Sequence, residues 1–260
     1  MSKIGVGIIT YNRPDFFDQC LNSIDSKKID NLIVVNDGTP YKSVNAPLIQ
    51  HEKNQGVGKS KNSAFKFLLE KGCDHIFLIE DDIIIKNNNV FDAYIDASNT
   101  TGIKHMMYGY HGPANKKNGI PNPRYIFDYG NNMKIAMNQH CVGAFCYYTR
   151  DVLENVGLND ETFINAWEHV EHSYRIVKTG YLPSYWWWPD IKNSSEYIDE
   201  LACSEVNSTI RPQSTWRENI TNGAKYFISK HGLSPVSIPD TSLDAVTAKL
   251  KKIHTDYAKH

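Results

Sequence analysis

The sequence predicts an α/β protein whose mostly parallel, Rossmann-like sheet is flanked by helices. Through the first hundred residues, short apolar runs rich in Ile and Val alternate with segments whose apolar residues recur at helical spacing. Turn residues separate the two kinds of segment, and such alternation is typical of doubly wound sheets. The strands expected in this part are residues 4–10, 32–35, 48–51 and 76–79, and the expected helices are 16–24, 58–71 and 91–97.

Each of these elements has a local signal. The first strand runs into Thr10-Tyr11-Asn12-Arg13, and Pro14 then fits the first turn of a helix. The second strand ends at the dense turn signal of residues 36–40. In the second helix, Ala64, Phe67 and Leu68 mark the inward face. The strand at 76–79 is a continuous apolar run, which suits a buried strand.

The second half of the chain is less regular. Residues 112–132 are rich in Gly, Pro and Asn and predict a long loop, which in a compact domain is mobile or functional. A strand is expected at 142–148, with helices at 151–156 and 166–179. Residues from 185 onward are aromatic and irregular until a helix at 242–257. We therefore expect a core of residues 1–182 and an aromatic, partly helical C-terminal extension of residues 183–260.

The composition indicates a globular protein of enzyme size. Its 260 residues are 41% hydrophobic, and a net charge of −1 gives no overall basic field for nucleic acid or membranes. The five cysteines form no Cys-x-x-Cys pair, which favours reduced thiols. The apolar segment at residues 4–9 is too short for a signal core, and no window reaches about eighteen apolar residues. We therefore expect no membrane span and a cytoplasmic location, in a bacterium or a virus-infected host cell.

The most informative feature is Glu80-Asp81-Asp82, three acids between an apolar strand and Ile83-Ile84-Ile85. Burying charge is costly, so these acids need a partner or a position where the strand opens into a cleft. Ligands of open α/β sheets bind at the carboxyl ends of the strands. Hard oxygen ligands there suit Mg²⁺ or Mn²⁺, which neutralises a diphosphate. A plain acidic turn after the strand is the alternative.

Two more clusters lie near the same edge of the sheet. Asp37 can accept hydrogen bonds from a pyrimidine or ribose, or it can form an Asx turn before Gly38. Residues 54–62 superficially resemble a phosphate-binding loop, but Lys53 stands where that motif needs its first Gly, so we reject it. A helix start with Lys59 and Lys61 near a diphosphate fits better, because helix N-termini and cations attract phosphate.

A polar helix and an aromatic run complete the candidates. On a helix, Glu168, Glu171, His172 and Arg175 share one face. They are either an ion-pair ladder or, with His169, a general-base constellation. The run Trp186-Trp187-Trp188 can line a cleft or fill the core, because alternate residues of an extended segment face opposite ways.

In this order the clusters resemble the family 2 glycosyltransferases and their relatives with the GT-A fold, from residue 4 to about residue 180. That family opens with a strand ending in Thr-Tyr-Asn-Arg, here residues 10–13, and its second strand ends in Asp-Asp-Gly-Ser, here residues 36–39. Its Asn-x-Gly…Arg-Asn segment resembles residues 54–62 with Lys61 for arginine, and its Asp-x-Asp motif resembles Glu80-Asp81-Asp82. Residues 141–144 look like its Gly-rich strand under the donor sugar. Its Glu-Asp-x-Asp-Leu-x-x-Arg helix resembles residues 168–175, with His169 where the family has its catalytic Asp.

The resemblance implies a metal-dependent, inverting glycosyltransferase that moves a sugar from a nucleotide donor, UDP first among them, to a hydroxyl of a glycan. Asp82, with Glu80 and His231, would hold Mn²⁺ or Mg²⁺, and Glu168 or His169 would take the acceptor proton. The C-terminal extension would contribute to the acceptor cleft and a lid, with the acceptor between residues 111–132 and 186–188. The expected donor-binding residues are Thr10, Tyr11, Asn12, Arg13, Asp37, Asn54, Gly56, Lys61 and Asp81.

Three alternatives remain open at this point. A glycosyltransferase acting on hydroxymethylated pyrimidines of phage DNA fits the same motifs. A non-catalytic carbohydrate-binding protein on this scaffold is possible, because His169 replaces the usual base. A sugar-1-phosphate nucleotidyltransferase shares the fold class, but residues 10–13 do not supply the Gly-rich loop it needs. Nothing in the sequence decides the donor sugar or the oligomeric state.

Overall fold

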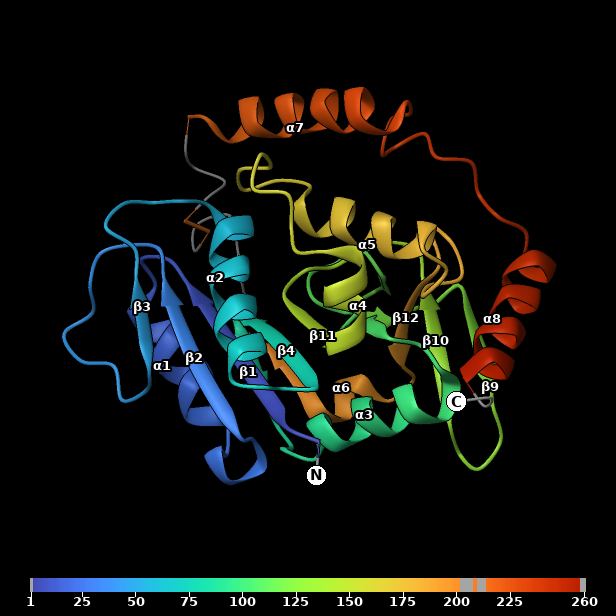
Figure 1. Ribbon diagram of the computed structural model, residues 1–260, viewed down its shortest axis with the longest axis horizontal. Coiled ribbons are helices and arrows are strands. Elements are labelled where there is room, and N and C mark those ends of the chain that lie inside the picture. The colour runs from blue at the N-terminus through green and yellow to red at the C-terminus, as the bar shows by residue number, and fades with distance from the viewer. Residues whose placement is uncertain (1, 202–207, 210–213, 258–260) are drawn as a thin grey trace.

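A six-stranded sheet forms the centre of the molecule (Figure 1). The computed structural model describes residues 2–201, 208–209 and 214–257. The strands are ordered β3-β2-β1-β4-β11-β6; the first four run parallel, and β11 is antiparallel to both of its neighbours. The predicted α/β class with a mostly parallel sheet is confirmed. The strands are β1 (Ile4–Thr10), β2 (Asn31–Asn36), β3 (Leu48–Gln50), β4 (His75–Glu80), β6 (His105–Met107) and β11 (Phe145–Thr149).

Helices cover both faces of this sheet. The connection from β1 to β2 and the one from β3 to β4 step in opposite directions along the sheet, so α1 and α2 lie on opposite faces (Figure 1). A short 3₁₀ helix (Ser26–Lys28) precedes β2. The helices of this part of the chain are α1 (Pro14–Ser23), α2 (Val57–Glu70), α3 (Val90–Thr101), α4 (Arg150–Val156) and α5 (Glu168–Lys178).

The region predicted as a long loop holds strands. A hairpin of β7 (Lys116–Lys117) and β8 (Ile120–Pro121) comes first, and β9 (Tyr125–Asp128) then joins β10 (Lys134–Asn138) and β12 (Trp188–Ile191) in a three-stranded antiparallel sheet. The Gly and Asn residues of this segment supply its turns, with positive φ at Asn118, Gly119 and Gly130. The loop prediction was therefore wrong for β9, which forms a hairpin with the adjacent β10, and only β10 reaches a strand distant in sequence, β12.

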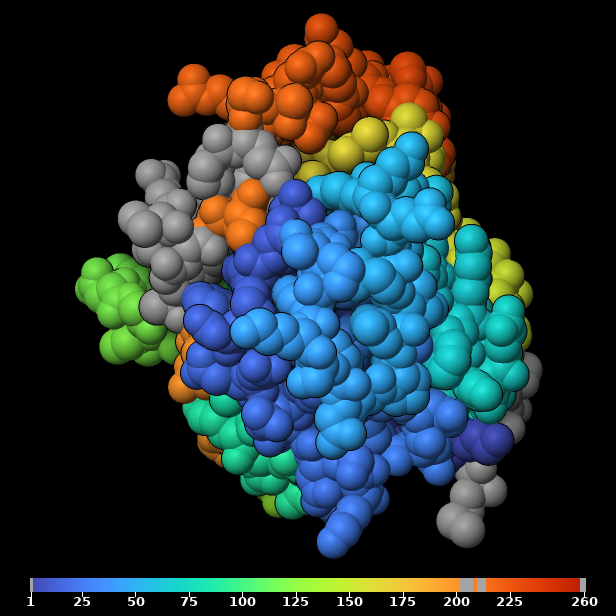
Figure 2. All heavy atoms as spheres, turned by 90° about the vertical axis from the view of Figure 1, so that its left-hand side faces the viewer, coloured from blue at the N-terminus to red at the C-terminus, as the bar shows by residue number. Residues whose placement is uncertain are grey.

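The C-terminal part is also more regular than its sequence indicated. It contains α6 (Ser194–Tyr197), β13 (Ile198–Glu200), which pairs with β5 (Ile83–Ile85), α7 (Trp216–His231) and the predicted terminal helix, α8 (Leu243–Tyr257). Helix α7 lies across the top of the molecule above α5, and a long segment leads from it to α8 beside α3 (Figure 1). From the side, α7 rests on the segment that leads into α5 (Figure 2).

Two composition-based expectations can be compared with this structure. The four cysteines in the described part of the chain are free thiols, as predicted, and Cys203 lies outside the described residues. Among the described helices, none combines the length and apolarity needed to cross a bilayer.

Candidate active site

A pocket opens at the carboxyl ends of β1, β2 and β4. The parallel register places Thr10 beside Asn36 and Ile9 beside Glu80, so the polar segments after the three strands meet at one edge. The pocket is lined by residues from all three strand ends and from the start of α2, including Thr10, Tyr11, Arg13, Asp37, Asn54 and Asp81. Six of the predicted donor-binding residues therefore share one wall.

Asp37 fixes the turn that leads into α2. One carboxylate oxygen accepts the backbone N–H of Gln55 and the other that of Gly56, both at 2.8 Å, and the His51 ring nitrogen Nδ1 is 2.6 Å from the first oxygen. The Asx bond to Gly38 comes instead from the side chain of Asn36. Gly56 has φ +86°, a conformation that favours glycine. Asp37 is thus a buried anchor at the pocket wall.

Asn12 connects the loops that follow β1 and β2. Its side-chain oxygen accepts the N–H of Thr39 at 2.7 Å, which ties the turn after β1 to the turn after β2. Asn12 is not among the residues that line the pocket. Tyr41 was not among the predicted site residues, and its hydroxyl bonds Thr10 Oγ1 at 2.7 Å and accepts the N–H of Arg13 at 3.1 Å.

Arg13 and the acidic triplet form the floor of the site. The guanidinium of Arg13 pairs with Asp81 and, at 3.2 Å, with Oδ2 of Asp82. Thr10 donates its hydroxyl to Asp81 at 2.7 Å. Burial raises the pKa of Asp81 to about 6, despite the opposing effects of Arg13 and Thr10. Burial acts the same way on Asp82, but His111 and Arg13 outweigh it and hold its pKa below the usual range.

Lys61 does not reach toward the pocket as its predicted role requires. Its ammonium is buried, 2.9 Å from Glu80 Oε1, 3.4 Å from Glu168 Oε1 and 3.1 Å from the carbonyl oxygen of Gly143. Burial lowers the pKa of Lys61, but the two carboxylates outweigh burial and raise it. Lys61 is therefore a buried cation that joins α2, the end of β4 and the start of α5.

Glu168 and His169 form a pair in the wall of a second, larger cleft. Oε1 of Glu168 lies 3.0 Å from Nδ1 of His169. Burial would raise the pKa of Glu168, but the charges of His169 and Lys61 outweigh it and lower the pKa. Gly143 makes room for the imidazole, because a Cβ there would lie 2.8 Å from Cγ of His169. This cleft adjoins the donor pocket, with which it shares Arg13, Glu80 and other lining residues.

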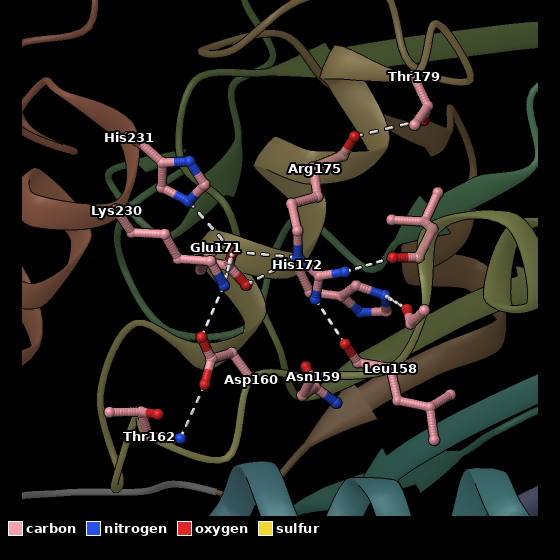
Figure 3. A network of polar contacts seen from close by, with 12 residues as sticks. Leu158, Asn159, Asp160, Thr162, Glu171, His172, Arg175, Thr179, Lys230 and His231 are labelled. Atoms are coloured by element: carbon pink, nitrogen blue, oxygen red, sulfur yellow. Dashed lines mark hydrogen bonds and ion pairs between the residues drawn. The ribbon is translucent and has the colours of Figure 1, made fainter.

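The other polar side chains of α5 do not line the large cleft. Glu171 is fully buried and is held by Arg175 at 3.0 Å, Lys230 at 2.9 Å and His231 at 3.1 Å (Figure 3). His172 donates to the carbonyl oxygen of Gly157 in the core. The pair Glu171–Arg175 confirms one rung of the predicted ion-pair ladder, buried rather than on the surface.

His231 is part of this same cluster. Its Nε2 faces Glu171, its ring packs against Tyr174 and Phe227, and it does not line the cleft that contains Glu80 and Asp82. The predicted third member of a metal site, the last residue of α7, is thus engaged with Glu171 of α5 instead (Figure 3).

The large cleft also contains residues that the sequence reasoning missed. The loop after β6 brings His111 to the cleft, and β13 brings Glu200. Trp216, at the start of α7, lines it as well, whereas the cleft does not include residues 186–188. Trp187 and Trp188 are buried and Trp186 is partly buried, and the indole N–H groups of Trp186 and Trp187 bond to Ile238 and Asp240. The expectation that this run lines the acceptor cleft was wrong.

Whether the acidic edge fits a divalent cation can be tested on two atoms. Oδ1 of Asp82 and Nε2 of His111 are buried, lie 3.3 Å apart and have no hydrogen-bond partner. An orphaned carboxylate oxygen at a cleft edge is a fitting metal ligand. Within residues 2–201, 208–209 and 214–257, no group of three or more His, Cys, Asp or Glu side chains forms a ready-made metal site. A cation here would thus need oxygens from its substrate or from water.

Comparison with known proteins gives two curated relatives, and no protein-family model matches the chain. An uncharacterized glycosyltransferase of Acanthamoeba polyphaga mimivirus is 27% identical over 216 residues, which is 75% of this chain and 80% of the relative. The dTDP-rhamnosyl transferase RfbF of Shigella flexneri is 25% identical over 207 residues, 74% of this chain and 68% of the relative.

Solved structures extend the similarity over nearly the whole chain. TarS 1–349 of S. aureus, in complex with UDP-GlcNAc, has a TM-score of 0.54 at 16% identity and covers 96% of this chain and 71% of its own. GalNAc-T7, with UDP, GalNAc and Mn²⁺, has a TM-score of 0.56 at 11% identity; this chain spans 99% of its own length and 55% of that protein.

The fold, with its strand-end pocket and acidic edge, is therefore the GT-A fold. Combined with the two curated relatives, it identifies the chain as a glycosyltransferase.

Proposed function

We propose that this enzyme transfers a sugar from a UDP-sugar to a hydroxyl of a glycan, with inversion at the anomeric carbon and a divalent cation bound. The observation that carries the proposal is the adjacency of the strand-end pocket, the acidic edge and the Glu168–His169 pair. UDP complexes of TarS and GalNAc-T7, proteins with the same fold, support the choice of UDP. The dTDP-rhamnosyl transferase among the relatives makes dTDP the second candidate.

The donor would occupy the pocket at the ends of β1, β2 and β4. Asp37 and Asn54 would face the nucleoside, since Oδ2 of Asp37 accepts only the N–H of Gly56 from the backbone and can accept another hydrogen bond. Thr10, Tyr11 and Arg13 would line the same pocket, with Arg13 turning from the two aspartates toward the diphosphate. Asn12, Gly56, Lys61 and Asp81 would act indirectly, by holding the loops and charges around the donor.

His169 is the group we assign as the general base. A carboxylate only accepts hydrogen bonds, so the contact with Glu168 requires a proton on Nδ1 of His169. The neutral ring then has its lone pair on Nε2, and the His169 side chain is 26% exposed. Glu168 itself is buried and paired with the ammonium of Lys61, which stabilises the carboxylate and makes Glu168 a weak base. Glu168 would therefore orient His169 and stabilise the imidazolium.

The reaction would be a single displacement. His169 would take the proton of the acceptor hydroxyl as its oxygen attacks the anomeric carbon, and the bond from that carbon to the UDP oxygen would break. Asp82 would hold the cation, with Glu80 beside it kept in place by Lys61. When bound, Mn²⁺ or Mg²⁺ supplies Lewis-acid stabilisation of the charge on the departing diphosphate. The Mn²⁺ in GalNAc-T7 supports this requirement.

The acceptor would lie in the large cleft. Its walls come from residues 112–119 on one side and from Ala166, His169 and Trp216 on the other. Aromatic rings stack on sugar faces, so Trp216 is our choice for an acceptor platform. Residues 183–260 contribute Glu200, Thr209 and Trp216 to this cleft, which supports the division into a core of residues 1–182 and an extension that completes the site.

A donor screen tests the proposal. The enzyme is incubated with UDP-, GDP- and dTDP-sugars, each with Mn²⁺, with Mg²⁺ and with a chelator, and nucleotide release is measured. We expect release of UDP from one UDP-sugar, dependent on the cation and abolished in Asp82→Ala. Release only from a dTDP-sugar would replace UDP in the proposal. Turnover undiminished by the chelator would contradict the role given to the cation.

A further inference from the structure

The edge of the large cleft contains an unusual pair of polar atoms. Oδ1 of Asp82 and Nε2 of His111 face each other at 3.3 Å, and both atoms are buried without a hydrogen-bond partner. The Asp82 side chain is only 5% exposed, and its other oxygen already pairs with Arg13. The two atoms are within ion-pair distance of each other, and Nε2 of His111 also lies 3.7 Å from Oε2 of Glu200, but neither buried atom makes a hydrogen bond. A cation bound between Asp82 and His111 would satisfy both atoms at once.

Hydrogen bonds and an ion pair hold the loop that carries His111 in position. Glu200 accepts the N–H of Gly112 and the ammonium of Lys116, each at 2.6 Å, and so holds the loop on both sides of its turn. Strand β13 pairs with β5 so that Glu200 stands opposite Ile83, the residue after Asp82. Asn115 closes the base of the loop with bonds to Gly109 and His140.

We propose that His111 binds the divalent cation through Nε2, next to Asp82. The inference rests on the proposed function, in which Asp82 holds that cation. It replaces the expected role of His231, whose Nε2 is engaged with Glu171. Two protein ligands leave the remaining coordination positions to diphosphate oxygens and water, as is common where a cation bridges protein and substrate. Imidazole nitrogen suits transition metals better than Mg²⁺, so His111 would favour Mn²⁺.

Nitrogen coordination can be detected directly. Mn²⁺ is added to the full-length enzyme with UDP, and pulsed electron paramagnetic resonance measures the coupling between Mn²⁺ and ¹⁴N. We expect a directly bound nitrogen in the wild type and its loss in His111→Gln. The same coupling should persist in His169→Gln and in His231→Gln, which are the matched controls.

Calorimetry provides the second measurement. His111→Gln should weaken Mn²⁺ binding in the presence of UDP by about tenfold or more, comparable to losses at other metal sites. Binding of Mg²⁺ should change less, so the preference for Mn²⁺ over Mg²⁺ narrows. If the Gln variant does not fold, His111→Asn is measured, and the wild-type spectrum alone still decides whether nitrogen is bound.

The possible results distinguish this inference from the proposed function on which it rests. Mn²⁺ that binds with UDP but shows no ¹⁴N coupling, or coupling that survives in His111→Gln, overturns the inference and leaves the proposed function intact. In that case His111 is an ion-pair partner of Asp82 only. If the wild type binds no Mn²⁺ in the presence of UDP, the cation requirement of the proposed function fails together with the inference.

Discussion

At the scale of single residues, the pairing of Glu168 with His169 decides which group can accept a proton. The sequence placed both residues at the start of one helix but could not order them, because their roles depend on Lys61, which lies over a hundred positions earlier. Lys61 holds Glu168 as an ionised partner, and Gly143 leaves space for the imidazole. The two side chains therefore have different environments although they are adjacent in the chain.

Substitution of His169 should remove general-base catalysis. His169→Ala should lower turnover by roughly 10²–10⁴, while donor affinity measured by calorimetry stays close to that of the wild type. Added imidazole should restore part of the turnover, because a small base can occupy the space of the missing ring. His254→Ala, on the terminal helix, is the control and should have normal turnover.

Glu168→Gln should differ from His169→Ala in its response to added imidazole. It should also lower turnover, since Nδ1 loses its charged partner, but imidazole should not rescue it. The variant should be less stable as well, because the buried ammonium of Lys61 would lose its buried carboxylate partner and keep only the partly exposed Glu80. Full turnover in His169→Ala, combined with loss in Glu168→Gln, would make Glu168 the base.

The site residues that could be predicted from the sequence are those at the ends of the parallel strands. Thr10, Asp37 and Asp81 follow parallel strands, and strands of that kind end at one edge whatever their loops do. His111 and Glu200 could not be found this way. Their meeting depends on the pairing of β13 with β5, two three-residue strands more than a hundred residues apart. Neither strand has a pattern that specifies its partner.

At the scale of elements, α7 acts as a brace for the loop that precedes α5. Trp167 has φ +70°, which is strained for a bulky residue, and its indole N–H is held at 2.9 Å by the carbonyl oxygen of Ile220 in α7. Lys230 and Tyr226, also on α7, both bond Asp160, and Figure 3 shows the contact with Lys230. The sequence did not predict α7, because little of it is buried: Gly223 and Phe227 are its only buried residues.

A side chain added at Gly223 of α7 should therefore lower turnover by displacing the loop before α5. A Cβ at Gly223 would lie 2.8 Å from Cδ1 of Trp167, so Gly223→Ala must displace the tryptophan or the helix. We expect a lower turnover with nearly unchanged UDP affinity, since the donor pocket is formed by other elements. Asn222→Ala, at the exposed neighbouring position of the same helix, is the control. Equal turnover in the two variants would show that α7 does not position the Trp167 loop.

A second element-scale prediction concerns Asp190 on β12. Its carboxyl is fully buried and accepts hydrogen bonds from Tyr94, Ser194 and the N–H of Gly109, which joins α3, α6 and the end of β6. Burial raises the pKa of Asp190 to about 7, although these donors act in the opposite direction. Between about pH 4 and about pH 7, the carboxyl of Asp190 is therefore protonated in the native state and ionised in the unfolded state.

The sign of the pH effect follows from this difference. The contribution of Asp190 to the free energy of unfolding is fully present below about pH 4 and is lost as the pH rises through about 7. Urea denaturation of the wild type should therefore give lower stability at pH 8 than at pH 5.5, and Asp190→Asn should reduce the difference between the two values. An identical pH dependence in both proteins would mean that Asp190 is ionised throughout.

At the scale of the whole molecule, the charge balance favours the proposed glycan acceptor over DNA. The chain has 28 basic and 29 acidic residues, and several of its basic groups, including Arg13, Lys61 and Lys116, are committed to carboxylates around the cleft. Binding to duplex DNA releases counterions and normally requires an excess of exposed cations along the contact. We therefore expect no detectable binding of duplex DNA, with or without hydroxymethylated pyrimidines, at low salt in the presence of UDP and Mn²⁺. Fluorescence anisotropy with labelled duplexes across a salt series measures this directly. Micromolar affinity that falls by several powers of ten between low and moderate salt would overturn the glycan acceptor and favour DNA.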